Sequence, residues 1–408
     1  MTAVLRLLAA IVFVVLLIPV LLLLLGTGVP LWAITLMTLA DLALLILAFK
    51  FKWTLKGVAV MLGGALLVAA AAVALSQVLA LTPPITDAQG NPLPNSIALL
   101  EKVNLNDSEQ WITIRGKDVS KPILLYLGLG GPGAGGFAMR PLFEPLEEHF
   151  VVVSWDEPGT GKSYSAVPIK SLTPQQFVDD AYALTQMLCQ RFDKQKVYVY
   201  GVSWTSIVGI WLVQQHPDLY YAYIGNGQMI NTTENDVMGY EFAIQYLTER
   251  GDTAGVEQLR RNGPPPYVGD GLALKYVAYL DVLNEYMGTL PYSVVVPLIP
   301  MFSPEYGLID KVNHFRGLYE SFEAVYPQLS DLDFTTQAAK LDVPVYIFAG
   351  RNDVNAMTSL VEEYFNVLQA PHKELIWFEN GGHGLEEGTM AQFTDVMVNE
   401  VLKYSQQN

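Results

Sequence analysis

A serine in a tight turn is the residue with the clearest chemical meaning in this sequence. Ser203 is the third residue of a Gly-Val-Ser-Trp-Thr segment that follows the apolar run Val197–Tyr200 and precedes the amphipathic run Ser206–Gln215. A turn between a strand and a helix would hold the serine in a strained conformation with its hydroxyl exposed. The amino terminus of the helix would also favour negative charge nearby. The pattern therefore predicts that Ser203 is a nucleophile.

Two later turns supply a carboxylate and an imidazole. Asp353 follows the apolar run Val343–Ala349, and His383 lies in a glycine-rich turn after Glu374–Phe378. His383 would accept the Ser203 proton and return it to the leaving group, while Asp353 would orient the imidazole and stabilise its charged form. The order serine, aspartate, histidine is that of an α/β-hydrolase triad. The other histidines do not follow the last predicted strand: His149, His216, His314 and His372.

A further turn is rich in glycine. Residues 129–133 read Leu-Gly-Gly-Pro-Gly and follow the predicted strand Pro122–Gly128. Glycines let backbone N–H groups approach an oxyanion, so we predict an oxyanion hole formed by Gly130 or Gly131 together with the N–H of Trp204. The pattern does not distinguish the two glycines. A nucleotide-binding loop is excluded, because the Gly-Lys-Ser/Thr ending is absent here.

The composition excludes other classes of chemistry. The chain has 40 acidic and 24 basic residues and a net charge of −16, which argues against a nucleic-acid partner. Its single cysteine excludes an internal disulfide and a cysteine-built metal site, and no two histidines are paired at helical spacing. We therefore expect no metal and no cofactor.

The elements that position these turns alternate between two kinds. Short apolar runs typical of strands are separated by helical stretches such as Pro174–Arg191, which has Thr173 as a candidate N-cap. This alternation predicts an α/β domain with a mostly parallel sheet and helices on both faces. The predicted strands are Ile97–Leu105, Trp111–Arg115, Pro122–Gly128, Phe150–Trp155, Val197–Val202, Tyr220–Ile224, Val343–Ala349 and Glu374–Phe378.

Strand signals stop between residues 228 and 340. Glu234–Glu249, Thr253–Arg261 and Leu272–Met287 show helical patterns instead. We interpret this stretch as a helical cap insertion. It would lie over the carboxyl ends of the strands, where sheets of this kind hold their sites, and act as a lid.

Three apolar runs precede the predicted domain, namely Leu7–Leu25, Leu31–Phe49 and Gly57–Leu81. Each is near or above the roughly 18–20 residues that a helix needs to cross a bilayer. Residues 7–81 therefore predict three transmembrane helices in contact with lipid.

The cations of this region indicate its orientation. Three lysines, Lys50, Lys52 and Lys56, crowd the second connection, and cations between spans stay cytoplasmic. We expect a multi-pass protein of the cell membrane, with its amino terminus in the cytoplasm and everything after Leu81 on the outer face.

Four motifs together resemble the proline iminopeptidase branch of the α/β-hydrolase superfamily. Residues 129–133 look like its His-Gly-Gly-Pro-Gly loop, 156–163 like its Asp-Gln-Arg-Gly-x-Gly-x-Ser turn, 201–206 like its Gly-Gly-Ser-Trp-Gly-Ser elbow, and 381–384 like its histidine loop. The resemblance covers the chain from about Ser96 onward. It implies an α/β-hydrolase fold with a helical cap, and an enzyme that cleaves an amino-terminal residue, often proline, from peptides.

Three positions depart from the family pattern. Leu129 replaces the loop histidine and Pro158 replaces the arginine, so polar groups that brace the oxyanion loop are missing. Thr205 replaces a glycine of the elbow, where a β-branched residue must fit close to the sheet. The loss of the histidine and the arginine bears on substrate and rate more than on the triad. At position 205 a threonine is still small enough to fit.

The resemblance also implies that carboxylates of the cap hold the free amine of the substrate. Glu234, Asp236 and Glu241 lie near the start of the insertion and are the candidates. A desolvated carboxylate would distinguish an amino-terminal peptide from a neutral ester. The alternative for each of them is a solvated acidic position on a helix.

The sequence thus predicts a membrane-anchored serine hydrolase that acts on a peptide or a small molecule, most simply an aminopeptidase that prefers proline. A membrane-proximal esterase or lipase and a non-catalytic binding protein are the alternatives, and the oligomeric state is not indicated. We expect an anchor at 1–82, a linker at 83–95, the two parts of the core at 96–227 and 341–408, and the cap at 228–340.

Overall fold

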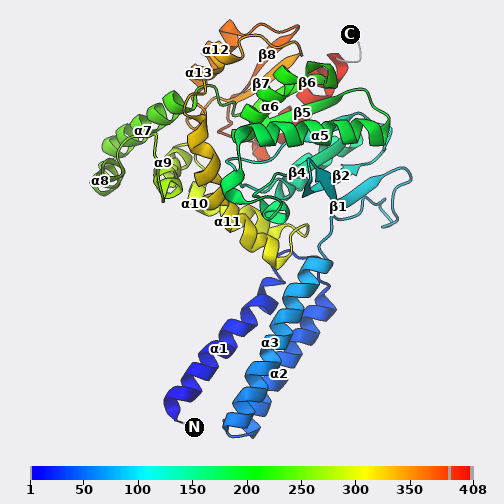
Figure 1. Ribbon diagram of the computed structural model, residues 1–408, viewed down its shortest axis with the longest axis vertical. Helices are drawn as coiled ribbons and strands as arrows, with labels where there is room; N and C mark the ends of the chain where they lie inside the picture. Colours follow the sequence, from blue (N-terminus) through cyan, green and yellow to red (C-terminus); the bar gives the residue numbers. More distant parts are fainter. Residues whose placement is uncertain (1, 385–386, 405–408) are drawn as a thin grey trace. The chain divides into compact units, whose positions relative to one another are not determined.

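The computed structural model describes residues 2–384 and 387–404 and divides the chain into two compact units. The helical unit consists of Met1–Pro83 and Ile299–Val312, and the sheet unit consists of Pro84–Leu298 and Asn313–Asn408. A short segment more than 200 residues further along the chain therefore groups with the amino-terminal helices, while the rest of the insertion groups with the sheet (Figure 1).

Three long apolar helices form most of the helical unit: α1 (Ala3–Leu22), α2 (Leu31–Lys50) and α3 (Leu55–Val78). The side chains of Thr2 and Thr54 cap α1 and α3 by accepting a backbone N–H from the first turn. Each helix is long and apolar enough, by length and composition, to cross a membrane.

The sheet unit is built on eight strands in the order β1-β2-β4-β3-β5-β6-β7-β8. Strands β3 to β8 pair in parallel, whereas β1 and β2 form an antiparallel hairpin that also joins β4 antiparallel. The predicted α/β class with a mostly parallel sheet is confirmed. The strands are β1 (Ile97–Leu105), β2 (Ser108–Gly116), β3 (Ile123–Tyr126), β4 (Val151–Asp156), β5 (Val197–Val202), β6 (Tyr220–Asn226), β7 (Val345–Gly350) and β8 (Lys373–Phe378).

Two apolar cores lie on the two faces of this sheet. One contains residues of α5 and α6, including Phe177 and Ile207, and the other contains Phe143 and Phe393. The predicted N-cap of α5 is present, because Thr173 accepts the N–H of Gln176. The helices flanking the sheet are α4 (Arg140–Phe143), α5 (Pro174–Phe192), α6 (Trp204–Gln215), α13 (Thr358–Val367) and α14 (Met390–Val396).

Between β6 and β7 the chain is helical. The three helical patterns expected there correspond to α7 (Thr232–Glu249), α8 (Thr253–Asn262) and α9 (Leu272–Tyr286), which Figure 1 shows gathered at one side of the sheet. Three further helices were not recognised from periodicity: α10 (Tyr292–Leu298), α11 (Leu308–Val325) and the short α12 (Phe334–Gln337). Tyrosine and phenylalanine rings, among them Tyr276 and Phe322, dominate the core that joins α7, α8, α9 and α11.

Candidate active site

Ser203 is held in a strained turn between β5 and α6. Its backbone has φ 54° and ψ −119°, a conformation that non-glycine residues rarely adopt and that costs about 1–3 kcal/mol. The turn is tight enough that a β-carbon on Gly201 would lie 2.5 Å from the carbonyl oxygen of Thr205. A glycine is therefore required at position 201, and the turn has the geometry expected of a nucleophile elbow.

Thr205 fits the elbow by bonding to it. Its Oγ1 accepts the N–H of Val202 at 2.8 Å and lies 2.9 Å from the carbonyl oxygen of Gly128, to which it donates. Gly128 lies two residues beyond the end of β3, in the segment that leads into the glycine-rich loop. The departure from the family pattern at this position thus ties the elbow to the loop instead of forcing them apart.

The structure brings Ser203, His383 and Asp353 together. Ser203 Oγ lies 2.9 Å from His383 Nε2, and the Asp353 carboxylate accepts from His383 Nδ1 at 3.0 Å. The three residues follow β5, β8 and β7. These strands are parallel, so their carboxyl ends lie on the same side of the sheet. This arrangement can take a proton from the serine hydroxyl and stabilise the resulting imidazolium.

Asp353 is oriented by its own turn and by the cap. Its carboxylate is 3% exposed and accepts the N–H groups of Asn355 and Ala356 at 2.8 and 2.9 Å. Asn235 on α7 donates to the carbonyl oxygen of Asn355 and accepts the N–H of Met357. The first helix of the cap therefore fixes the loop that carries the acid.

The predicted oxyanion donors are available in the structure. Trp204 is the first residue of α6, and Gly130 has a positive φ of 58°. Within the part of the chain that the structure describes, no hydrogen-bond acceptor is assigned to the backbone N–H of Gly130, Gly131 or Trp204. These N–H groups are the candidates for binding a developing oxyanion.

Glu157 joins the loop to the elbow. Its carboxyl group is 1% exposed, accepts the indole N–H of Trp204 at 3.1 and 3.2 Å, and accepts the N–H of Gly133 at 3.4 Å. Burial raises the pKa of Glu157 to about 8, against the effect of these hydrogen bonds. Glu157 lies in the turn that resembles the family, but no role was assigned to it from sequence.

A buried histidine of the cap supports the same loop. His314 on α11 accepts the N–H of Gly135 at Nδ1 and lies 3.2 Å from the carbonyl oxygen of Val296 through Nε2. Burial lowers the pKa of His314 to about 4, so the ring is neutral near neutral pH and carries its proton on Nε2. The brace that Leu129 cannot supply therefore comes from the insertion, which sequence spacing could not indicate.

Of the three cap carboxylates, Asp236 is the one buried in a cavity. It is 4% exposed, and the hydroxyls of Tyr279 and Tyr326 donate to Oδ1 at 3.2 and 2.9 Å. Burial raises the pKa of Asp236 to about 7, although hydrogen bonds from tyrosines oppose the shift. Asp236, Tyr267, Tyr276 and Tyr326 help to line a cavity of about 240 Å³.

Aromatic rings connect Asp236 to the glycine-rich loop. Tyr326 stacks on Phe322 with ring centroids 4.5 Å apart. The Phe322 ring in turn lies beside the loop, because a β-carbon on Gly131 would be 3.2 Å from it. Two aromatic rings therefore lie between Asp236 and the loop.

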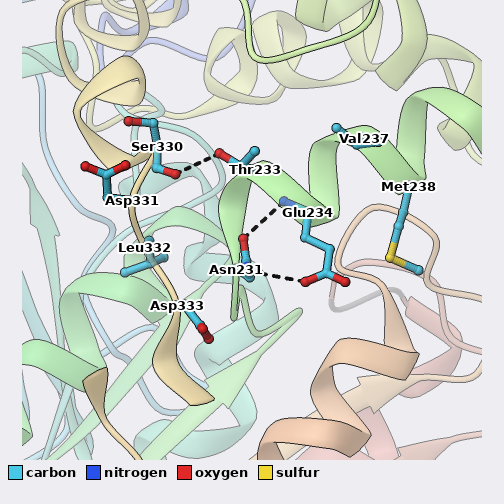
Figure 2. Close-up of a pocket in the computed structure, with 9 residues that line it drawn as sticks. All are labelled: Asn231, Thr233, Glu234, Val237, Met238, Ser330, Asp331, Leu332 and Asp333. Atoms are coloured by element: carbon cyan, nitrogen blue, oxygen red, sulfur yellow. Dashed lines mark hydrogen bonds between the residues drawn. The ribbon is translucent and has the colours of Figure 1, made fainter. Parts of the chain in front are cut away.

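The other two carboxylates are exposed. Glu241 lies on the outer side of α7, and Glu234 lines an open hollow together with Asn231 and Asp333. Figure 2 shows Asn231 bonded to Glu234 at the start of α7, as an N-cap. Neither the lining of this hollow nor that of the cavity beside Asp236 includes any of the three residues that meet at the elbow.

In the described part of the chain, no group of three or more histidine, cysteine or acidic side chains could hold a metal ion. The site consists of polar side chains and backbone N–H groups.

The mostly parallel sheet and the elbow between β5 and α6 define an α/β-hydrolase. The proline iminopeptidase of Mycobacterium smegmatis has a similar structure, with a TM-score of 0.56 at 16% identity over 76% of this chain and 99% of that one. A bacterial membrane phospholipase A has a TM-score of 0.52 at 16% identity, over 76% of this chain and 87% of that one. These TM-scores show a shared fold.

A sequence relative defines the family more closely. The probable aminopeptidase YbaC of Bacillus subtilis (strain 168) is 30% identical over 299 residues, which are 72% of this chain and 92% of YbaC. The chain belongs to the family of this protein within the α/β-hydrolase superfamily. No protein-family model matches the chain.

Proposed function

We propose that this protein is a membrane-anchored serine aminopeptidase that releases amino-terminal residues, with proline preferred, from peptides. The observation that carries the proposal is the contact of Ser203 with His383 and of His383 with Asp353, at 2.9 and 3.0 Å. Membership in the family of a probable aminopeptidase supports the reaction class.

The reaction would proceed in two halves. His383 Nε2 takes the Ser203 proton as Oγ attacks the carbonyl carbon, and the oxyanion binds the N–H of Trp204 and of Gly130 or Gly131. His383 then protonates the leaving amine, and the peptide bond breaks to leave an acyl-enzyme. A water molecule loses a proton to His383, attacks the acyl carbon and restores the Ser203 hydroxyl as the amino acid leaves.

Asp236 is the proposed binding residue for the substrate amine. Among the three candidates it alone is desolvated and surrounded by tyrosine rings, whose faces also attract a cation. An ammonium bound there would hold Asp236 in its ionised form, against the effect of burial on its pKa. Glu234 and Glu241 are exposed and would add little to such binding.

The helices α1, α2 and α3 are proposed to span the cell membrane. Lys50, at the end of α2, and Lys56, in the first turn of α3, would lie on the cytoplasmic side with the amino terminus. The sheet unit would then face the outside of the cell and act on extracytoplasmic peptides.

Turnover of a prolyl anilide and of a short acyl ester by the purified full-length protein tests this function. We expect the wild type to cleave the anilide, and Ser203→Ala to lose about 10³-fold or more of this kcat/KM. Ester cleavage without anilide cleavage would make the protein an esterase, and turnover of neither substrate would favour a binding protein.

A further inference from the structure

The segment Ile299–Val312 of the insertion is bonded to the ends of the amino-terminal helices. The N–H of Leu81, just beyond α3, donates to the carbonyl oxygen of Pro304 at 3.1 Å. The N–H of Leu308 donates to Ser76 Oγ on α3 at 3.0 Å, and the Leu308 side chain packs in the apolar core of the helical unit. Hydrogen bonds and apolar packing therefore join the segment to the helical unit.

Lys311 fixes the segment to the carboxyl end of α1. Its Nζ donates to the carbonyl oxygens of Leu25, Gly26 and Met301 at 3.0, 2.9 and 2.6 Å. Carbonyl groups at the carboxyl end of a helix lack partners within the helix. A cation there donates hydrogen bonds to them and interacts favourably with the partial negative charge of the helix dipole. Burial lowers the pKa of Lys311 to about 8.

Asp310 makes a second attachment, to α3. Gln77 donates from Nε2 to Asp310 Oδ1 at 3.1 Å and accepts the N–H of Ile309 at 3.2 Å. Gly307 donates its N–H to Asp310 Oδ2 at 2.8 Å. The polar groups of the segment thus point inward, where specific partners satisfy them.

The exposed residues of the segment have the opposite character. Glu305, Asp310 and Lys311 are 1%, 5% and 4% exposed, whereas its three exposed side chains, Phe302, Ile309 and Val312, are 65%, 47% and 58% exposed. A surface in water carries its charges outside and buries large apolar groups. This inverted distribution is the one expected of a surface that faces lipid.

The position of the segment agrees with this chemistry. It contacts the carboxyl ends of α1 and α3, which have 20 and 24 residues. Helices of that length are about 30 Å long or slightly more, close to the thickness of the hydrocarbon core. A segment at their ends lies at the boundary between acyl chains and headgroups, where large apolar side chains are stabilised.

We propose that Ile299–Val312 is a membrane-contacting element, in which Phe302, Ile309 and Val312 insert into the interface of the outer leaflet. The inference rests on the proposed membrane anchoring by α1, α2 and α3. It adds a contact with lipid from a segment more than 200 residues further along the chain, within the insertion. The buried Lys311 and Asp310 hold that segment in place.

Depth-dependent quenching of a fluorescent label tests the element in the full-length protein. Cys189 is the single cysteine, so Cys189→Ser leaves a background for one introduced thiol. Phe302→Cys, carrying an environment-sensitive fluorophore, is placed in phosphatidylcholine vesicles with lipids spin-labelled near the glycerol or near the chain end. We expect stronger quenching by the label near the glycerol and little quenching by iodide in the water.

Two matched labels keep this inference separate from the proposed anchoring. Leu39→Cys lies within α2, where its side chain is 54% exposed, and should be quenched best by the label near the chain end. Val119→Cys, an exposed apolar position of the sheet unit, should be quenched by iodide alone.

If the Leu39 label is quenched by lipid but the Phe302 label is quenched only by iodide, the membrane-contacting element is wrong and the anchor stands. If the Leu39 label is also quenched only by iodide, the anchor and the element are both wrong. Ile309→Cys repeats the measurement at a second position of the segment.

Discussion

Glu157 places one carboxyl group between the two parts of the proposed oxyanion hole. It accepts the Trp204 indole N–H from the elbow helix and the Gly133 N–H from the glycine-rich loop. A residue in this position acts through others, because it sets the distance between donors that would bind the oxyanion.

Glu157→Ala should therefore lower kcat by about 10-fold with a smaller change in KM, since the donors are misplaced in the transition state more than in substrate binding. Glu157→Gln is the matched control, because an amide keeps one oxygen at the position of Oε1, which contacts both N–H groups, and loses only the second contact of Trp204 with Oε2. Its kcat should stay within about 3-fold of the wild type. Equal losses in the two variants would show that the hydrogen bonds of Oε1 do not position the site.

The ionisation of Asp236 should be visible in substrate choice. The pKa of Asp236 is raised to about 7 by burial, so the empty site gains its negative charge as the pH rises through that value. The kcat/KM for a prolyl anilide should then rise relative to that for a neutral ester, and the ratio removes the common effect of His383. The ratio in Asp236→Asn should be lower and independent of pH. A wild-type ratio without pH dependence would contradict the assignment of the amine site.

Helix α11 illustrates how the insertion supports the sheet. His314 accepts the N–H of Gly135, and Ser321 donates to the carbonyl oxygen of Gly159. One helix therefore stabilises two turns, one after β3 and one after β4. Insertions are often treated as lids alone, but here the loop that would bind the oxyanion depends on a cap residue.

The contribution of His314 to the stability of the fold should be lost at acid pH. The pKa of His314 is lowered by burial to about 4 from 6.5, so its contribution to stability is complete above about pH 6.5 and is lost as the pH falls through 4. The free energy of unfolding should fall in that window by up to about 1.4 kcal/mol per pH unit for this one proton. His314→Asn, which keeps an acceptor for Gly135, should lack this component. Parallel pH curves for the two proteins would refute it.

The sequence predicted the residues that follow strands better than the residues that support them. Ser203, Asp353 and His383 could be found because each lies in the turn after a short apolar strand, and the carboxyl ends of parallel strands lie on the same side of the sheet. His314 and Glu157 could not, because their contacts with the loop arise only from tertiary packing. A glutamate at position 157 and a histidine in a helical insertion carry no local signal of this role.

The cap carboxylates show the same limit. Glu234, Asp236 and Glu241 lie within two turns of one helix, and no pattern distinguished the buried one from the exposed ones. Burial of Asp236 depends on Tyr279 of α9 and on Tyr326, just beyond the end of α11, which reach it from 43 and 90 residues away.

At the scale of the whole molecule, the proposed anchor would determine which side of the membrane the proposed reaction serves. Protease added to intact cells should cut the chain after the last span, for example in the exposed turn near Gly90, and leave an amino-terminal tag protected. An immunoblot for the carboxyl-terminal fragment measures this. Protection of the chain until the membrane is permeabilised would contradict the outside location of the sheet unit.

The central claim is that Ser203 is a nucleophile activated by His383 and Asp353. Mass spectrometry of the full-length protein after reaction with a fluorophosphonate measures it most directly. The account predicts one adduct on Ser203 in the wild type, none in Ser203→Ala, and labelling slowed by at least about 10²-fold in His383→Ala. Absence of a Ser203 adduct on the folded wild type, or equal labelling rates with and without His383, would contradict it.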